Sequence, residues 1–235
     1  MTKGRLYLIP SPLGDYDPAL VIPAGTLDIL RSLHCFVVEE TRTARRYLSA
    51  AGLKGHIGEL EFHELNEHTT APEVEALLAL FDSGDVGLIS EAGLPAVADP
   101  GAALVALCHR NGITVVPLSG PSSLMLALMA SGLDGQSFAF RGYLPAKTDE
   151  RKAAIRRTEK DSAAFKQTQI FIETPYRNDS LLKDMTETLG PDTKLCIAAD
   201  ITLPGSLIIT KKVSQWKKTQ ITIGKRPCVF LILAK

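Results

Sequence analysis

Three short loops hold small, stiff and polar residues in patterns that suit ligand binding. Pro10–Asp15 contains two prolines and a glycine, which stiffen the turn directly after an apolar run. Ser90–Gly101 consists mostly of small residues, and its glycines let a ligand approach the backbone closely. Ser119–Ser123 offers hydroxyls and backbone amides at the start of an apolar segment. Each loop also has a structural interpretation: the first suits an ordinary turn, and Asp99 and the serines suit helix caps.

Charged and aromatic residues gather in three further segments. Glu39–Arg42 follows an apolar run, and Arg141–Pro145 places a guanidinium beside a tyrosine. Glu173–Arg177 has a carboxylate, an aromatic ring and a guanidinium within five residues, at the end of another apolar run. That combination suits substrate binding or acid–base catalysis, whereas a surface ion pair is the commoner alternative.

Several familiar motifs do not occur. The chain has no GxGxxG, GxxxxGK[ST] or GxSxG sequence, so phosphate-loop, dinucleotide and hydrolase chemistry lack support. His63–His68 contains histidine and glutamate without HExxH spacing, and the four cysteines lie far apart in the sequence. We therefore expect no metal, and we expect the cysteines to be reduced thiols, most of them in apolar runs. These cysteines are Cys35, Cys108, Cys196 and Cys228.

The elements that must position these loops alternate regularly in the first half of the chain. Apolar runs predict strands over 6–9, 35–38, 86–89 and 113–116. Helical spacing predicts helices in 18–33 (apolar from 27 onward) and over 44–51, 72–81 and 102–109. Strands alternating with helices indicate a parallel α/β sheet, and ligands bind such sheets at the carboxyl ends of their strands.

The pattern changes near residue 118. A helix is expected over 124–130, followed by strands over 137–140, 169–173, 194–199, 206–210 and 228–233. Further helices are expected over 148–159 and 178–189, and the last two strands are expected to pair antiparallel because no helix separates them. We therefore predict an α/β protein with a parallel-sheet domain at 1–118 and a mixed-sheet domain at 119–235.

Composition excludes some classes and leaves others open. The chain has 235 residues, of which 45% are hydrophobic, and 26 basic residues balance 26 acidic ones. The net charge of zero is unevenly distributed along the chain: residues 1–118 carry −7 and residues 119–235 carry +7. The second half could therefore meet phosphate backbones. The apolar runs are too short for a signal peptide or a membrane span, so we expect a cytoplasmic protein.

Taken together and in order, these segments resemble the tetrapyrrole methylase superfamily of S-adenosylmethionine (SAM)-dependent methyltransferases. Within it, the chain is most similar to the ribosomal RNA small subunit methyltransferase I family. The segments that carry the resemblance are LYLIPSPLGDYD, VVEETRTARRYLSAAG, FHELNEH, LISEAGLPAVADPG, VVPLSGPSSLMLALMASGL, FRGYLP and IFIETPYR. The resemblance implies two α/β domains with SAM bound in the cleft between them, and a homodimer.

The resemblance also assigns cofactor-binding residues, position by position. In the first domain and the interdomain turn it implies contacts from Leu13, Gly93, Leu94, Pro95, Val97, Ser122 and Ser123. In the second domain it implies contacts from Glu173, Ala198 and Cys228. Leu94 stands where a threonine is common in the family, which removes one hydroxyl from the expected cofactor site.

The implied reaction transfers a methyl group to a ribose 2′-hydroxyl of small-subunit rRNA. A base must accept the hydroxyl proton, and the candidates are Glu40, Glu91 and His63. Phosphates or bases would be held by Arg42, Arg141, Tyr176 and Arg177. The family's Arg-Glu-Leu-Thr-Lys segment is replaced here by Ala199–Pro204. Two alternatives stay open: a C-methyltransferase acting on a tetrapyrrole or another small substrate, as in the wider superfamily, and a non-catalytic SAM-binding module, which the altered segment suggests.

Overall fold

A parallel five-stranded sheet forms the centre of the first part of the chain, in the computed structural model that describes residues 3–235. Its strand order is β3-β2-β4-β1-β5, and every pairing between neighbours is parallel. The strands are β1 (Leu6–Ile9), β2 (Cys35–Val38), β3 (Glu61–Glu64), β4 (Val86–Ile89) and β5 (Val115–Pro117). The carboxyl ends of these strands therefore open onto one edge, where the loops singled out in the sequence begin.

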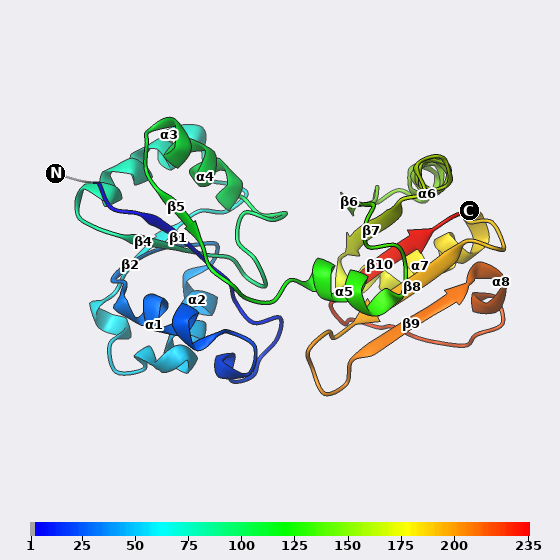
Figure 1. Cartoon of the computed structure of the whole chain (residues 1–235), viewed down its shortest axis with the longest axis horizontal. Helices are drawn as coiled ribbons and strands as arrows, with labels where there is room; N and C mark the ends of the chain where they lie inside the picture. Colours follow the sequence, from blue (N-terminus) through cyan, green and yellow to red (C-terminus); the bar gives the residue numbers. More distant parts are fainter. Residues whose placement is uncertain (1–2) are drawn as a thin grey trace. The chain divides into compact units, whose positions relative to one another are not determined.

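Helices cover both faces of this sheet (Figure 1). Successive side chains of a strand point to opposite faces, and these strands place apolar side chains on both. Phe36 and Val38 pack with α1 (Ala24–Ser32) and α2 (Thr41–Leu48), whereas Val37 packs on the opposite face. That second face is covered by α3 (Ala71–Ala76) and α4 (Gly101–Arg110). The predicted strands 6–9, 35–38 and 86–89 are confirmed with those bounds.

Two predicted helices differ in how they begin and end. The helix expected over 44–51 begins at Thr41, because the Glu40 carboxylate caps it, and it continues as a π-helical turn to Leu53. The helix expected over 72–81 is α3 followed by a 3-10 segment, Leu77–Asp82. Strand β3 is absent from the sequence prediction because it is an edge strand in which no residue is fully buried.

The chain divides into two compact units after Ser122, four residues beyond the boundary expected from the sequence. The second unit begins with α5 (Ser123–Ser131) and has a second five-stranded sheet in the order β6-β7-β10-β8-β9. Its strands are β6 (Phe138–Tyr143), β7 (Thr168–Glu173), β8 (Lys194–Ala199), β9 (Leu207–Lys212) and β10 (Cys228–Leu233). Its other helices are α6 (Thr148–Phe165), α7 (Asn178–Thr188) and α8 (Val213–Trp216).

The second sheet is mixed, as the sequence predicts. β6 and β7 pair parallel, whereas the other neighbours are antiparallel. The expectation that the last two strands pair with each other is wrong, because β8 lies between β9 and β10 and pairs antiparallel with both. Buried residues of α6 and α7, such as Ile155, Leu181 and Met185, pack with those of this sheet. Within residues 3–235, no helix is both long and apolar enough to span a membrane.

Candidate active site

The loops after β1 and β4 are joined by a short backbone bridge. The Ser11 amide donates to the Gly93 carbonyl at 2.9 Å, and the Gly93 amide donates back to the Ser11 carbonyl at 3.1 Å. The Ser11 hydroxyl also donates to the Ser90 carbonyl at 2.9 Å. The hydroxyl of Tyr47, on α2, donates to the Pro10 carbonyl at 2.8 Å. Two of the three loops suspected from the sequence thus form one connected structure.

Gly93 has a conformation and surroundings that suit glycine. Its φ is +81°, a region that side chains with a Cβ rarely adopt. A Cβ at this position would lie 3.3 Å from the Leu13 Cδ2 atom and 3.6 Å from the Pro121 carbonyl oxygen. Gly120 is constrained by packing alone, since a Cβ there would lie 2.2 Å from the Pro10 Cβ atom. All three suspected loops therefore meet, backbone against backbone, within the first unit.

The loop after β4 is held in an unusual shape by Asp99. Its Oδ1 atom accepts hydrogen bonds from the Ala96 amide at 2.9 Å and the Gly101 amide at 2.7 Å. Ala96 and Ala98 both have positive φ, at 64° and 62°. Such strain costs stability and persists where surrounding contacts over-determine the backbone, often at functional sites. The capping interpretation explains the bond to Gly101, but it does not explain the two alanines.

A cavity of about 230 Å³ lies against these loops. One wall is Ser11–Tyr16, and a second wall contains Glu91 and Ala92. The third wall is one face of α2 and its extension, where the lining residues recur at helical spacing: Thr43, Arg46, Tyr47 and Ala50. The cavity thus combines a preset backbone, a carboxylate and a guanidinium at the carboxyl edge of the sheet.

The carboxylates beside this cavity differ in their pKa. Burial raises the pKa of Glu91, and the nearby Glu39 and Glu40 carboxylates raise it further, although Thr43 and Arg46 oppose this. Burial also raises the pKa of Glu39, whose Oε2 atom accepts from the Glu91 amide at 3.3 Å. By contrast, hydrogen bonds from the Thr43 hydroxyl and the Arg42 and Thr43 amides lower the pKa of Glu40. Glu40 is therefore a helix cap, whereas Glu91 has the raised pKa that suits a general base.

The other sequence candidates of the first unit lie in different places. His63 is on β3, 2.7 Å from the Glu61 carboxylate through its Nε2 atom, and it does not line the cavity. Arg42 is exposed at the start of α2, beside a second, open hollow that it shares with Glu40, Thr43 and Arg46. Val97 is exposed and Pro95 is buried, both in the loop after β4. The structure thus brings Leu13, Gly93 and Glu91 together and leaves His63 apart.

The three candidates of the second unit gather at one end of its sheet. Cys228 lies opposite Glu173 on β7 and opposite Ala199 on β8, and Ala198 pairs with the following residue of β10. The Glu173 Oε1 atom accepts from Arg177, whose Nη2 atom is 2.6 Å away. Its Oε2 atom is buried and has no hydrogen-bond partner among the described residues. A buried carboxylate oxygen without a partner is unusual and is available to a ligand donor.

The suspected substrate residues of the second unit differ in how free they are. Arg141 donates to Gln169 at 2.6 Å and pairs with Asp161 at 3.2 Å. Tyr176 has 79% of its surface exposed, and the Lys225 ammonium lies 4.9 Å from its ring centre. Tyr176 is therefore the side chain of this group that is most open to a stacking partner.

Sequence reasoning missed the cavity wall contributed by α2. Thr43, Arg46 and Tyr47 were not among its candidates, and Glu39 lay in a segment that it singled out but received no role. The signal was present, since positions 43, 46, 47 and 50 form one helical face that starts directly after a strand. Glu39 gives no comparable signal, because its role depends on the Glu91 amide reaching it from another loop.

Comparisons with known proteins identify relatives of this chain. The family described as Tetrapyrrole (Corrin/Porphyrin) Methylases matches residues 5–216. A Vibrio cholerae protein named Ribosomal RNA small subunit methyltransferase I is 35% identical over 84% of this chain and 65% of its own length. A Pasteurella multocida protein of the same name is 31% identical over 99% of this chain and 80% of its own. The chain thus spans less than two thirds of the Vibrio relative.

The fold also occurs among solved structures. A uroporphyrin-III C-methyltransferase from Thermus thermophilus, solved with S-adenosyl homocysteine, superposes with a TM-score of 0.57. The superposition covers 98% of this chain and 97% of that one, at 18% sequence identity, so it establishes a shared fold and no more. With the two-sheet architecture, the match over residues 5–216 shows that this chain belongs to the tetrapyrrole (corrin/porphyrin) methylase family.

Proposed function

We propose that this protein is a SAM-dependent methyltransferase that methylates a ribose 2′-hydroxyl of small-subunit rRNA. The observation that carries the proposal is the position of Glu91: a carboxylate of raised pKa follows β4 in the same wall that is fixed by the Ser11–Gly93 bridge. The names of the Vibrio and Pasteurella relatives support the choice of substrate. The family match supports the class of reaction.

The residues present fit the cofactor that this function requires. A Cβ at Gly93 would crowd Leu13, and one at Gly120 would clash with Pro10, so glycine at these positions lets the three loops pack together as a fixed backbone scaffold. The Ser90 hydroxyl and the Asp99 Oδ2 atom are buried without a hydrogen-bond partner in the described part of the chain. Residues that would hold SAM in the first unit are Leu13, Gly93, Leu94, Pro95, Val97 and Ser122. Those in the second unit are Ser123, Glu173, Ala198 and Cys228. When bound, SAM would supply an electrophilic methyl group, whose bond to sulfur breaks as the new O–C bond forms, with S-adenosyl homocysteine as the leaving group.

Glu91 is the residue that we assign as general base. Its carboxylate accepts the proton that the ribose hydroxyl loses as the new O–C bond forms, and the nearby Arg46 charge stabilises its ionised form beforehand. Glu40 is less suited because three donors already hold it at the helix start. His63 is less suited because it lies outside the cavity lining. Arg46 also offers a cation within the cavity wall for a substrate phosphate.

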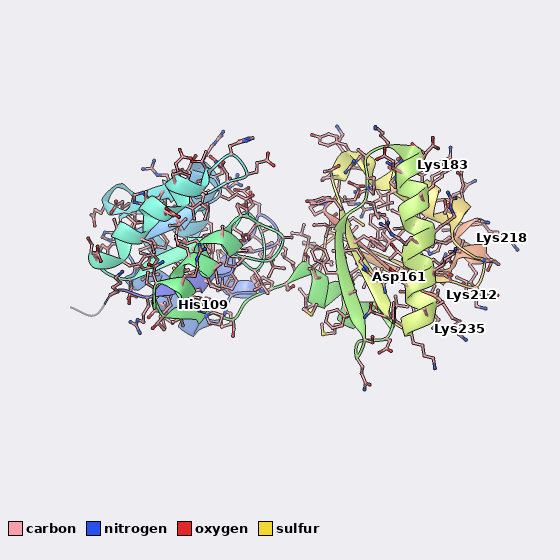
Figure 2. The ribbon with its side chains drawn as sticks, turned by 90° about the horizontal axis from the view of Figure 1, so that it is seen from above. His109, Asp161, Lys183, Lys212, Lys218 and Lys235 are labelled. Carbon is pink, nitrogen blue, oxygen red and sulfur yellow. The ribbon has the colours of Figure 1, made fainter. Side chains whose placement is uncertain are left out.

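The second unit has the charge that an RNA substrate requires. No charged residue lies between 119 and 122, so the net charges of −7 and +7 hold for the two units as they divide in the structure. Lys183, Lys212, Lys218 and Lys235 point outward from the second unit (Figure 2). The segment 211–226 has six basic residues and no acid. Such a surface attracts phosphates through counterion release, and Arg42, Tyr176 and Arg177 would add contacts to sugars or bases.

We further propose that the protein acts as a homodimer in the cytoplasm. Met125 and Met129 on α5 are 43% and 76% exposed, and exposed apolar side chains on one helix support a contact with another chain. Small-subunit rRNA as substrate supports a cytoplasmic location. Sedimentation of the purified chain tests the first point, since a single species of monomer mass would contradict it.

A transfer assay with competing acceptors tests the proposed reaction. Purified protein is incubated with labelled SAM and either small ribosomal subunits from a strain lacking the corresponding methylation or a reduced uroporphyrin. We expect label in rRNA, resistant to alkali as a 2′-O-methylated dinucleotide, and none in the tetrapyrrole. Label in the tetrapyrrole alone would favour the C-methyltransferase alternative. SAM binding without transfer to either acceptor would favour the non-catalytic module.

A further inference from the structure

Three side chains of types that bind metals meet on the first sheet, on β2 and the edge strand β3. Cys35 is the first residue of β2, and Glu61 and His63 are the first and third residues of β3. The Cys35 thiol, a Glu61 oxygen and a His63 ring nitrogen all lie within 4.8 Å of one another. The bridged active-site loops follow the carboxyl ends of β1 and β4, whereas this cluster lies on β2 and β3, so the two sites are separate.

Strand pairing brings the three side chains together. β2 and β3 pair in parallel with Cys35 opposite Glu61, and Val37 opposite His63. Side chains two residues apart point to the same face of a strand, so Glu61 and His63 share the face of Cys35. The intervening Phe62 points to the other face, where it stacks on Phe36 with ring centres 6.1 Å apart. Packing on one face of β3 thus fixes the ligands on the other.

The cluster is reachable from solvent. The side chains of Glu61 and His63 are 63% and 30% exposed, and Cys35 is half-buried. Cys35 and Glu61 also line a surface hollow that opens beside the amino ends of the strands. Four acidic residues line this hollow (Glu59, Glu61, Asp82 and Asp85) against two basic ones, Lys3 and Arg5, and Arg5 forms an ion pair with Asp85 at 2.7 Å. An ion therefore has a path to the site.

We propose that Cys35, Glu61 and His63 bind a zinc ion. A thiolate, an imidazole and a carboxylate are the ligand types that zinc takes, whereas magnesium and calcium prefer oxygen alone. Bonds of about 2.0–2.3 Å in a tetrahedral site place ligand atoms about 3–4 Å apart, which small side-chain rotations achieve here. Three protein ligands leave the fourth position to water. Binding releases the Cys35 proton, because the thiolate is the ligand.

This site could not be predicted from the sequence alone. The zinc patterns considered there require ligands close in sequence, such as CxxC or HExxH. Cys35 and Glu61 are far apart in the sequence and adjacent only because β2 and β3 pair. The expectation of no metal rested on those spacings and did not consider a site assembled across two strands.

Titration with Zn²⁺ against a chromophoric chelator, and with Co²⁺ as a spectroscopic probe, tests the proposal. The wild type should bind one equivalent of Zn²⁺, and its Co²⁺ form should show the charge-transfer absorption that a thiolate ligand produces. Cys35→Ser should abolish that absorption, and both Cys35→Ser and His63→Gln should weaken Zn²⁺ binding more than about tenfold. Far-ultraviolet circular dichroism checks that each variant is folded.

The matched control is His56→Gln. His56 also pairs with a glutamate, Glu59, at 3.2 Å on the same unit, and no cysteine belongs to that pair. Its Zn²⁺ affinity should equal that of the wild type. Absence of Zn²⁺ binding in the wild type, or equal affinity in all four proteins, would overturn the proposal.

Protection of the thiol gives an independent readout on the unmodified chain. Cys108, Cys196 and Cys228 are buried, whereas Cys35 is partly exposed, so a thiol reagent should label Cys35 first. Saturating Zn²⁺ should slow that labelling, and saturating Mg²⁺ should not. Equal labelling rates with and without Zn²⁺ would contradict the assignment of Cys35 as a ligand.

Discussion

Ser11 and Gly93 exchange two backbone hydrogen bonds, of 2.9 and 3.1 Å, although they belong to loops that follow different strands. β1 and β4 are neighbours in the sheet, so their carboxyl ends are already close. The bridge then fixes the two loops against each other and places Leu13 and Glu91 in walls of the same cavity. Because the two loops are already held in one conformation, less conformational entropy is lost when a ligand binds to them.

Gly93→Ala should weaken cofactor binding. The substitution forces a Cβ into positive φ, at a cost of about 1–2 kcal/mol, and brings it to 3.3 Å from Leu13. Calorimetric titration with S-adenosyl homocysteine measures the loss. Gly112→Ala is the control, because Gly112 also has positive φ, of +67°, but a Cβ there meets nothing within 4 Å. Both variants should lose similar stability, and only Gly93→Ala should lose affinity; equal affinity in the two would contradict the cofactor role.

Tyr47→Phe should destabilise the loop after β1, which begins at Pro10. The buried Tyr47 hydroxyl donates to the Pro10 carbonyl at 2.8 Å, so its removal leaves a carbonyl without that donor and costs about 1–2 kcal/mol of unfolding free energy. Urea denaturation measures the change. Tyr143→Phe alters an exposed ring on β6 and should stay within about 0.5 kcal/mol of the wild type. A neutral Tyr47→Phe variant would show that this bond does not stabilise the loop.

Arg177→Ala should reduce both stability and cofactor affinity. The Glu173 carboxylate is fully buried and its partner Arg177 is 30% exposed, so removing the arginine leaves a buried charge unpaired, at a cost of about 3 kcal/mol. Glu173 belongs to the proposed cofactor set, so we expect Arg177 to affect cofactor affinity in addition to the RNA binding that the sequence suggests for it. Lys183→Ala, which breaks an exposed pair with Glu187, should cost less than about 1 kcal/mol. Unchanged cofactor affinity in Arg177→Ala would limit this residue to the RNA-binding role.

The pH dependence of methyl transfer should show the raised pKa of Glu91. Activity needs the ionised carboxylate, so it is present above this pKa and is lost as the pH falls through it. Glu39→Gln removes a neighbouring negative charge that raises the pKa of Glu91, and glutamine keeps an oxygen for the Glu91 amide. The acid limb of the rate profile should therefore move to lower pH in this variant. A limb that stays in place would argue against Glu91 as the titrating group.

Exchanging two lysines of the second unit should weaken RNA binding without affecting cofactor affinity. Lys217→Gln with Lys218→Gln removes two exposed charges from the basic segment that follows β9. The slope of log affinity for rRNA against log salt should fall by about two. Lys54→Gln, an exposed lysine of the first unit, is the control and should leave the slope unchanged. Equal slopes in the three proteins would exclude this segment from the RNA interface.

Most of the fold could be predicted from residue pattern because its central strands are continuous apolar runs. β2, β4, β8 and β10 were identified with the bounds that the structure has. β3 was missed because none of its four residues is fully buried, and its sequence EFHE has one apolar side chain. The pairing of β9 and β10 was wrong because sequence order does not reveal that β8 is placed between them.

The candidate site could be located but not assembled from the sequence. The loops after β1 and β4 were singled out because glycines and prolines cluster there. Their bridge through Ser11 and Gly93 depends on which strands are neighbours, and spacing along the chain does not encode this. Glu40, Glu91 and His63 were equivalent as sequence candidates. They separate only when hydrogen bonds occupy Glu40 and strand β3 places His63 outside the cavity lining.

The most direct test of the account is the single-turnover rate of methyl transfer to small ribosomal subunits in Glu91→Gln. The control is Glu75→Gln, which makes the same change at an exposed position on α3. The account predicts that Glu91→Gln loses about 10²–10⁴-fold in rate and retains wild-type affinity for S-adenosyl homocysteine. It predicts that Glu75→Gln retains both. A Glu91→Gln rate within a few fold of the wild type would contradict the assignment of Glu91 as the base of this site.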